Sequence, residues 1–539
     1  MQTLYYGGSI ITMESITDHP EAVLVEDGII KKVGSFDALA SGLPLDVIKV
    51  DLQGRCLMPS FIDGHGHLAL NGLMSNFADL SGCTSHEEIV EVLKRFMVDE
   101  KISSRGIVMA TGYDHNFLAE GEHPVAEVLD LVSETIPVVA LHTSGHLACA
   151  NSRALVLMKI TDQTKDPDGG RFGRIAGTNT PNGYMEEAAM MKSLGKLALR
   201  MRVHPFKMMK KMQETYVEHG VTTVQDGATN KMFLMLLKMA DKLHKLQVDV
   251  VAYLILDDKV KGVLEKNTKY KNKYHKHLKI GGYKLILDGS PQGRSAWMTK
   301  PYLQGDEDYC GYGIMKDEDV NRLTLQAVDE GQQVLTHCNG DAAGDQWIRA
   351  YQYALEHSTH AQKDELRPVM IHCQTARKDQ LEQMAQLRMI ASIFVGHVYY
   401  WGDIHMQNFG ETRGQYISPV RDALDLGICV NFHQDTPVTK PNMMHTVWCA
   451  VNRMSRNGAT IGKSQAVKVY EALQAITTAP AYQYREEDSK GSICVGKRAD
   501  LVILDKNPLQ VPVMEIKDIR VLETIKDGER IFSVDDVSE

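Results

Sequence analysis

The sequence contains no C-x-x-C pair of cysteines and no basic, apolar leader at its N-terminus. Its nine cysteines are scattered and odd in number, which favours reduced thiols over a disulfide framework. No apolar run is long enough to span a bilayer, and the first eight residues lack the charge and apolar length of a signal peptide. We therefore expect a cytoplasmic protein that does not contact membranes.

An excess of positive charge is also missing. The formal net charge is -10, and no long run of like charge occurs, so nothing indicates binding to nucleic acid or anionic lipid. The chain has 539 residues, of which 43% are hydrophobic, and this is enough for one large core and a smaller domain. The expected partner is a small-molecule substrate, and a homo-oligomer is compatible with the sequence.

Short strands separated by turn residues occur at both ends of the chain, in residues 1–57 and 488–539. We expect these ends to form one small β-sandwich into which the middle of the chain, residues 58–487, is inserted. The Gly-rich stretch at about 151–199 is too long for a simple connection, and we interpret it as an insertion at the mouth of the middle domain.

The middle of the chain alternates apolar strand-like runs with helical stretches. This alternation predicts an α/β fold, a (β/α)8 TIM-like barrel. There are nine strand candidates for eight positions, so one of them lies outside the barrel or the count is wrong. The candidates are residues 57–62, 137–141, 221–225, 248–256, 280–287, 333–336, 369–371, 389–394 and 428–431.

Two histidines, His65 and His67, end the first apolar run of the middle domain. Side chains two apart on a strand face the same side, so two imidazoles at the open end of a barrel form half of a metal site. The ends of later strands carry further ligand types, namely His337, His372 and Asp435. Alone, each of these has a plainer interpretation, as a packed or solvated histidine or as an aspartate that caps a helix.

Lys284 lies inside the apolar run 281–287, where an unpaired ammonium would be costly unless it reached the surface. The order of two histidines, a lysine, two more histidines and an aspartate resembles the amidohydrolase superfamily, and most closely its YtcJ-like branch, amidohydrolase family 3. The matching segments are residues 59–67 (PSFIDGHGH), 144–146 (SGH), 151–152 (NS), 166–170 (DPDGG), 220–226 (GVTTVQD), 288–290 (DGS), 294–296 (RSA), 340–341 (GD), 435–438 (DTPV) and 491–505. They cover nearly the whole chain.

Three positions depart from the family pattern. Ile371 stands where many relatives carry glutamate, Cys338 stands where alanine is usual, and His433 with Gln434 replaces a Gly-Ser pair. By strand alternation, His433 would share the barrel face of Asp435. These departures concern the substrate pocket, whereas every expected ligand type is present.

The resemblance implies a metal-dependent hydrolase that cleaves an amide-type, non-peptide carbon-nitrogen bond of a small organic substrate. His65 and His67 would hold one metal, His337 and His372 a second, and a carboxylated Lys284 would bridge the two. Imidazole and carboxylate donors suit zinc or another divalent transition metal.

Asp435 would bind metal and act as general acid/base toward a metal-activated hydroxide. His146 would bind the oxyanion or the substrate, Arg294 would contact the substrate, and Asp288 and Asp341 would support the site.

Two other functions stay open. The first is a deaminase of the same fold with a single metal on His65, His67, one later histidine and Asp435, in which Lys284 is structural. The second is a catalytically inactive scaffold, although such a protein would have no physical reason to keep a buried lysine among histidines.

Overall fold

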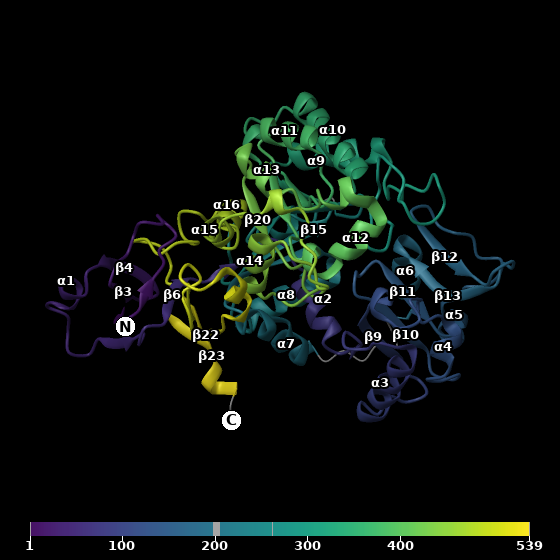
Figure 1. Ribbon diagram of the computed structural model, residues 1–539, viewed down its shortest axis with the longest axis horizontal. Helices are drawn as coiled ribbons and strands as arrows, with labels where there is room; N and C mark the ends of the chain where they lie inside the picture. Colours follow the sequence, from purple (N-terminus) through teal and green to yellow (C-terminus); the bar gives the residue numbers. More distant parts are fainter. Residues whose placement is uncertain (1, 198–204, 261, 538–539) are drawn as a thin grey trace.

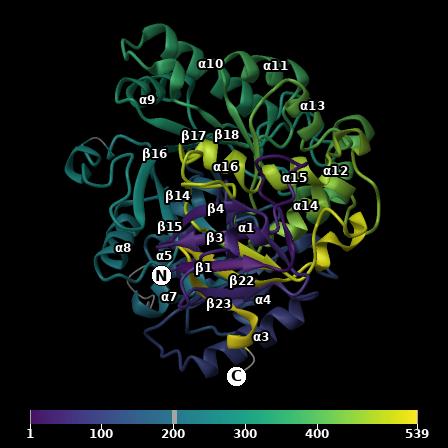
Figure 2. The same ribbon diagram turned by 90° about the vertical axis from the view of Figure 1, so that its left-hand side faces the viewer.

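The computed structural model describes residues 2–197, 205–260 and 262–537, and its elements form three parts (Figure 1). A parallel sheet with surrounding helices occupies the centre. Small sheets built from the two ends of the chain lie on one side of it, and a further sheet with its own helices lies on the other. Both chain ends are found with the small sheets, in front of the barrel in Figure 2.

The central sheet has eight strands, each parallel to its neighbours, in the order β20-β19-β18-β17-β16-β15-β14-β7. The strands are β7 (Phe61–Ile62), β14 (Val221–Thr229), β15 (Asp249–Ile255), β16 (Leu278–Ile286), β17 (Gln333–Cys338), β18 (Val369–His372), β19 (Ile390–Ile393) and β20 (Val430–Phe432). Every residue of β17, β18 and β19 is buried, as expected for parallel strands covered on both faces. This curled sheet confirms the predicted TIM-like barrel.

Eight of the nine predicted strands contribute to this sheet. The ninth, at 137–141, forms β10 (Val138–His142) in a different sheet. The candidate at 57–62 divides in two, because β6 (Cys56–Pro59) pairs with strands of the terminal sheets and only β7 enters the barrel. The apolar run is continuous across this division, so it gives no sign of the change of sheet.

The two edge strands of the barrel sheet, β7 and β20, are joined through the segment that follows α15 (Val469–Gln474). The Ile62 N–H donates to the Ile476 carbonyl over 3.0 Å, and the Phe432 N–H donates to the Ala475 carbonyl over 2.8 Å. The carboxyl ends of the first and last strands therefore lie close together. His65 follows one of these ends and Asp435 follows the other.

Helices surround the barrel sheet (Figure 1). Together with α15 they are α2 (Leu68–Met74), α7 (Pro205–Val217), α8 (Lys231–Lys242), α9 (Asp317–Asp329), α10 (Asp341–His357), α11 (Lys378–Gln386), α12 (His397–Gly414), α13 (Val420–Asp425), α14 (Met443–Asn452) and α16 (Thr478–Gln483). Asp341 at the start of α10 accepts the Thr299 N–H over 2.8 Å and pairs with Arg377, so it fixes the loop beside the barrel mouth.

A second sheet, which we call the cap sheet, has six strands in the order β12-β13-β11-β10-β9-β8. With its helices it comprises β8 (Ala78–Asp79), α3 (His86–Asp99), β9 (Val108–Tyr113), α4 (Ala126–Asp130), β10, β11 (Leu147–Ala150), α5 (Ser152–Met158), β12 (Gly170–Arg174), β13 (Pro181–Glu186) and α6 (Glu187–Leu194). The predicted insertion at 151–199 contributes α5, β12, β13 and α6 to it, while β8 to β11 come from earlier residues.

Asn151 directly precedes α5 and ties the helix to the sheet. Its Oδ1 accepts the N–H of Ala154 over 2.9 Å and the N–H of Val138 over 3.0 Å. It therefore caps the helix and holds β10 at the same time. The Asn-Ser pair recognised in the sequence has this structural role.

The ends of the chain form two small sheets, with the orders β4-β3-β1-β5 and β2-β6-β21-β22-β23. Beside β6, their elements are β1 (Gln2–Tyr6), β2 (Ser9–Ile10), β3 (Ala22–Glu26), β4 (Ile29–Gly34), α1 (Phe36–Ala40), β5 (Ile48–Asp51), β21 (Leu501–Leu504), β22 (Val521–Lys526) and β23 (Glu529–Ser533). One apolar cluster includes Tyr5, Val23, Leu501 and Ile525, so both ends share a core. Their description as one β-sandwich, with the bounds given above, stays a prediction.

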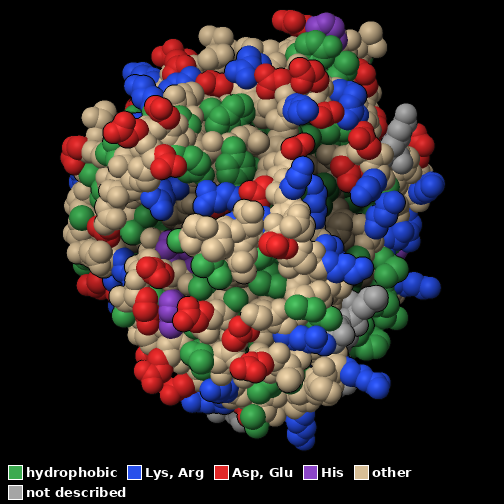
Figure 3. Space-filling model, turned by 90° about the vertical axis from the view of Figure 1, so that its right-hand side faces the viewer, with side chains coloured by type: hydrophobic (Ala, Val, Ile, Leu, Met, Phe, Trp, Pro, Cys, Tyr) green, Lys and Arg blue, Asp and Glu red, His purple; other side chains and the backbone are tan. Residues whose placement is uncertain are grey.

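Within the described residues, no helix combines the length and the apolar character that crossing a bilayer requires. Figure 3 shows the face on the side of the cap sheet, where lysine and arginine side chains are interspersed with aspartate and glutamate. Charge of neither sign dominates this face.

Candidate metal centre

Ligand-type side chains from the first and last barrel strands meet at the carboxyl end of the sheet. Asp435 Oδ1 lies 3.2 Å from His67 Nε2 and 3.5 Å from His65 Nε2. The other carboxylate oxygen, Oδ2, lies 3.8 Å from Nε2 of His372. His65, His67 and Asp435 together form a group that could hold a metal ion.

Lys284 reaches the same place from β16. Its side chain is buried, and its Nζ lies 3.0 Å from His65 Nε2. Burial lowers the pKa of the Lys284 ammonium to about 7, because a charged amine is poorly solvated there. A neutral amine is therefore accessible near physiological pH.

His337 and His372 occupy neighbouring strands, β17 and β18, with ring centroids 4.5 Å apart. Asp288 holds His337, since its Oδ1 lies 3.1 Å from His337 Nδ1. The same carboxylate accepts the N–H groups of Asn339 and Gly340 over 3.0 and 2.7 Å. Asp288 thus supports both a ligand-type ring and the loop that follows it, as the sequence predicted.

Three supporting contacts were not predicted. Gln225 in β14 bonds through Oε1 to His65 Nδ1. His433 Nε2 lies 3.2 Å from His372 Nδ1, and its Nδ1 lies 2.9 Å from Ser392 Oγ. Strand alternation placed His433 on the right face, but no sequence signal identified Gln225 or Ser392, because their partners lie on other strands.

The protonation states suit metal ligands. Burial lowers the pKa of His65 and of His372 well below the ordinary value, so both imidazoles are neutral. Burial alone would raise the pKa of Asp435, but the contact with His67 Nε2, 3.2 Å from Oδ1, and the electrostatic interaction with the surrounding imidazoles outweigh it and hold this pKa well below its usual range. Neutral imidazoles and an ionised carboxylate are the forms that bind metals.

Two atoms of this group are buried without a hydrogen-bond partner, His372 Nε2 and Asp435 Oδ1. An unsatisfied buried polar atom costs on the order of 1–3 kcal/mol, and more when it is charged. A cation between these atoms would remove the cost. The residues present therefore fit a metal ion.

His146 lies at the edge of the group, between β10 and β11 of the cap sheet. Its ring centroid is 5.2 Å from that of His337, and its Nδ1 is 2.8 Å from Glu187 Oε2. Burial lowers the pKa of His146, but the Glu187 carboxylate outweighs this effect and the pKa is raised overall. Arg294 is different: across the described residues, no hydrogen bond or ion pair joins its side chain to this group.

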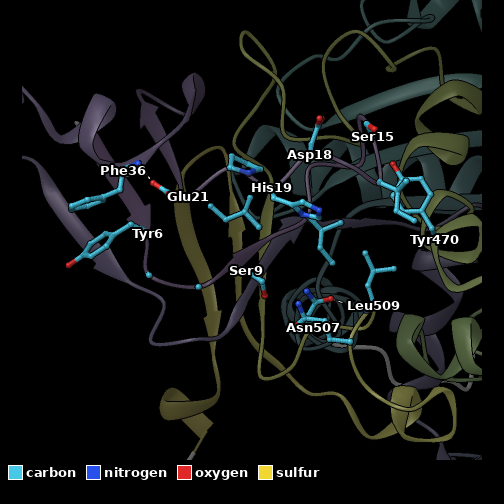
Figure 4. Close-up of a pocket in the computed structure, with 17 residues that line it drawn as sticks. Tyr6, Ser9, Ser15, Asp18, His19, Glu21, Phe36, Tyr470, Asn507 and Leu509 are labelled. Atoms are coloured by element: carbon cyan, nitrogen blue, oxygen red, sulfur yellow. Dashed lines mark hydrogen bonds between the residues drawn. The ribbon is translucent and has the colours of Figure 1, made fainter.

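A cavity of about 1000 Å³ lies elsewhere, between the first strands and the segments around Tyr470 and Asn507 (Figure 4). Tyr6, His19 and Phe36 are among its lining residues. None of the candidate metal ligands described above lines this cavity, so we assign the cavity no part in the chemistry.

The Amidohydrolase family model matches residues 49–532. The chain belongs to the amidohydrolase family. This membership confirms the predicted family and, with it, the predicted class of enzyme, a hydrolase that acts on carbon-nitrogen bonds.

Relatives of this amidohydrolase align over nearly its full length. It is 25% identical over 555 residues to the putative amidohydrolase YtcJ of Bacillus subtilis, covering 99% of each chain. It is 26% identical to the N-substituted formamide deformylase of Arthrobacter pascens, covering 96% of each. The structure of an uncharacterized metal-dependent hydrolase from Pyrococcus horikoshii superposes with a TM-score of 0.75 at 25% identity, covering 95% of this chain and 99% of that one.

Proposed function

We propose that this amidohydrolase cleaves an amide-type, non-peptide carbon-nitrogen bond of a small organic substrate, and that metal ions bound at the strand ends make the cleavage feasible. The observation that carries the proposal is the pair of buried, unpartnered atoms His372 Nε2 and Asp435 Oδ1 among neutral imidazoles. Without a bound cation, no interaction would offset the loss of hydration that these two buried atoms undergo on folding.

His65 and His67 would hold one ion, and His337 and His372 a second. Asp435 would complete the site. Nitrogen and carboxylate donors favour zinc or another divalent transition metal. When bound, such ions lower the pKa of coordinated water from about 15.7 to about 7 and so supply hydroxide near neutral pH.

Lys284 would join the two halves as a carbamate. Its neutral amine would add to the carbon of carbon dioxide, forming an N–C bond and releasing one proton, and the anionic product offers two oxygens. The buried position of Lys284 beside His65 supports this step, because an ammonium has no lone pair for the addition and burial disfavours it.

Asp435 would accept a proton from the attacking water and transfer it to the leaving nitrogen, since its carboxylate is ionised and contacts His67. His146, whose positive form Glu187 favours, would stabilise the oxyanion that develops on the substrate. Arg294 would contact more distant parts of the substrate. The protein would act as a cytoplasmic enzyme without nucleic-acid or membrane partners, alone or as a homo-oligomer.

The first test combines metal analysis with turnover. Purified protein would be assayed with a panel of N-substituted formamides, cyclic amides and N-acyl amino acids, and its metal content measured on the same sample. The formamides are included because the deformylase relative acts, by its name, on N-substituted formamides. We expect activity that a chelator abolishes and zinc restores.

Variants then assign the roles. Asp435→Asn should lower kcat by roughly 10²- to 10⁴-fold, the usual contribution of a general acid/base. Lys284→Ala should lower the metal content and remove the mass of one carbon dioxide from the native protein. His19→Gln, at an exposed position away from the centre, is the matched control. It should leave kcat, the metal content and the mass of the bound carbon dioxide unchanged. Full activity of Asp435→Asn in metal-free protein would refute the mechanism.

A single-metal deaminase is the second candidate. It is favoured because His65, His67 and Asp435 lie close enough together to hold one ion without Lys284. The metal count separates the two candidates. One ion per chain in the barrel, an unmodified Lys284 and release of ammonia from ring amines would support the deaminase.

A further inference from the structure

The barrel strand β19 carries none of the candidate metal ligands, yet a buried histidine follows its carboxyl end. Ile393, the last residue of β19, pairs with His372 on one side and with Phe432 of β20 on the other. His397 comes four residues later and begins α12. It is 4% exposed, and no step of the mechanism above uses it. Functional side chains of such barrels gather at the carboxyl ends of the strands, which is where His397 lies.

Phe394 connects His397 to the metal centre. Its ring centroid lies 4.8 Å from that of His397 and 5.6 Å from that of His433, which contacts His372. Burial lowers the pKa of His397 well below the ordinary value, and the opposing effect of the Asp435 carboxylate is smaller. The ring of His397 is therefore neutral and carries one proton.

A second histidine of α12 fixes where that proton lies. His405 Nε2 is 3.0 Å from His397 Nδ1, and the two ring planes are 8° apart. His405 is fully buried, and its other nitrogen, Nδ1, has no hydrogen-bond partner in the described part of the chain. A buried N–H without an acceptor is rarer than a buried acceptor without a donor, so the proton of His405 belongs on Nε2. His405 then donates to His397 Nδ1, which leaves the proton of His397 on Nε2.

The Nε2–H of His397 is thus a donor that the protein leaves unused. No described residue accepts from it, and unlike His405 Nδ1 it is not sealed from solvent. The ring packs on Trp401 with centroids 4.6 Å apart, and Trp401 Nε1 donates to Asp114 of the cap sheet over 2.9 Å. In Figure 1, α12 lies on the side of the barrel that faces the cap sheet. The donor therefore lies where the barrel mouth and the cap sheet meet.

We propose that His397 is a substrate-binding residue whose Nε2–H donates to a carbonyl oxygen of the substrate outside the bond that is cleaved, and that His405 is the positioning residue that keeps the proton on Nε2. This role rests on the amide hydrolysis proposed above, and it narrows the class of amide.

The surroundings of His397 indicate that class. Phe394 and Trp401, 1% and 2% exposed, offer apolar ring surface beside the donor. Burial alone would raise the pKa of Asp114, but hydrogen bonds with His142 and Trp401 outweigh it and lower this pKa overall, so an ionised carboxylate lies nearby. An anionic substrate group is disfavoured there. The substrate that fits is an amide with an apolar or aromatic substituent that also carries an uncharged carbonyl group.

The kinetic test uses N-formylphenylalaninamide and N-(2-phenylethyl)formamide, which differ only in one carboxamide group. In the zinc-loaded wild type we expect a KM about 10-fold lower for the first, the effect of one hydrogen bond. His397→Phe should abolish this difference and leave kcat and the metal content unchanged, as for a contact made equally in ground and transition states. His397→Gln keeps an N–H near the position of Nε2 and should keep most of the difference. Equal KM values for the two amides in the wild type would overturn the proposal.

Two variants of His405 separate positioning from packing. His405→Phe fills the volume without a donor, whereas His405→Gln keeps an N–H that can reach His397 Nδ1. We expect the first to behave like His397→Phe and the second like the wild type. His357→Phe, at the exposed end of α10, is the control and should change neither KM. Equal losses in the two His405 variants would overturn the positioning role.

Neutron diffraction from deuterium-exchanged crystals of the full-length protein gives a readout that does not depend on turnover. We expect deuterium on Nε2 of His405 and on Nε2 of His397. Deuterium on His397 Nδ1 with none on Nε2 would overturn the proposal, whatever the protein hydrolyses. A lack of turnover of every amide would refute the proposed function instead, and the position of the deuterium would still decide whether His397 is the donor.

Discussion

His372 can offer Nε2 to a metal only when the proton of its ring is on Nδ1. His433 Nε2 lies 3.2 Å from that Nδ1, and Ser392 Oγ lies 2.9 Å from the other nitrogen of His433. If His372 donates to His433, and His433 donates to Ser392, the lone pair of His372 Nε2 is left free. This agrees with its lack of a hydrogen-bond partner.

Replacing His433 should therefore weaken metal binding without removing a ligand. For His433→Leu we expect a loss of about 10- to 100-fold in zinc affinity, as is typical when the outer partner of a ligating histidine is lost. Competition with a chromophoric chelator would measure it. His433→Gln, which keeps an acceptor near the position of Nε2, should retain most of the affinity. Wild-type affinity in His433→Leu would show that the contact has no such role.

The ligand-type residues could be anticipated from sequence, and the residues that orient them could not. His337 and His372 come directly after apolar runs, and Lys284 interrupts one, so their positions along the chain carry a signal. Gln225 and Ser392 act across the sheet on residues more than 40 positions away. Such contacts depend on which strands become neighbours, and this is a property of the fold rather than of local sequence.

At the scale of elements, β14 approaches the first histidine so closely that a side chain cannot be placed between them. The Gly227 N–H donates to the Gly66 carbonyl over 2.8 Å. A Cβ at Gly227 would lie 2.7 Å from His65 Nδ1 and would also collide with Cε1 of that ring. The backbone of β14 is therefore part of the wall that fixes His65.

Gly227→Ala should displace His65. We expect a reduced metal content together with a loss of stability of about 1–3 kcal/mol, which is usual for overpacking. Gly82→Ala is the matched control, because no atom lies within 4 Å of its added Cβ. Metal analysis and thermal unfolding of both variants would check this. Equal metal content in the two proteins would mean that displacing His65 does not weaken metal binding.

The elements themselves were predicted unevenly. The strands from β14 to β20 follow from buried apolar runs, but the run at 57–62 gave no sign that it is shared between two sheets. The candidate at 137–141 is equally apolar and fully buried as β10, yet it belongs to the cap sheet. Apolar character reports burial, and it does not say which sheet buries the strand.

At the scale of the whole molecule, a buried ionic cluster joins the barrel to the C-terminal strands. Asp249 opens β15, and its Oδ2 lies 2.7 Å from Lys490 Nζ and 3.0 Å from Lys526 Nζ in β22. All three side chains are at most 3% exposed. The carboxylate thus contacts two ammonium groups from the C-terminal part of the chain, which also pair with Glu486 and Asp500.

Removing this charge should destabilise the folded protein. Burial alone would raise the pKa of Asp249, but Lys490 and Lys526 outweigh it and hold the pKa well below its usual range. Asp249→Asn removes one counter-charge from two buried ammonium groups, which keep Glu486 and Asp500 as partners, so we expect a loss at pH 7 below the roughly 3–5 kcal/mol of an unpaired buried charge. Asp258→Asn is the control, since Asp258 pairs with Arg322 at an exposed position, where a loss of at most about 1 kcal/mol is expected.

The difference in unfolding free energy between wild type and Asp249→Asn should depend on pH in a defined direction. Because the folded pKa of Asp249 lies below the unfolded value of about 3.9, its contribution is complete above that value and is lost as the pH falls through the folded pKa. Urea unfolding should therefore show a constant gap between wild type and Asp249→Asn from pH 5 to 7, and a narrowing gap below about pH 4. A gap that stays constant down to pH 3 would show that the ionised carboxylate gains no stability from the two lysines.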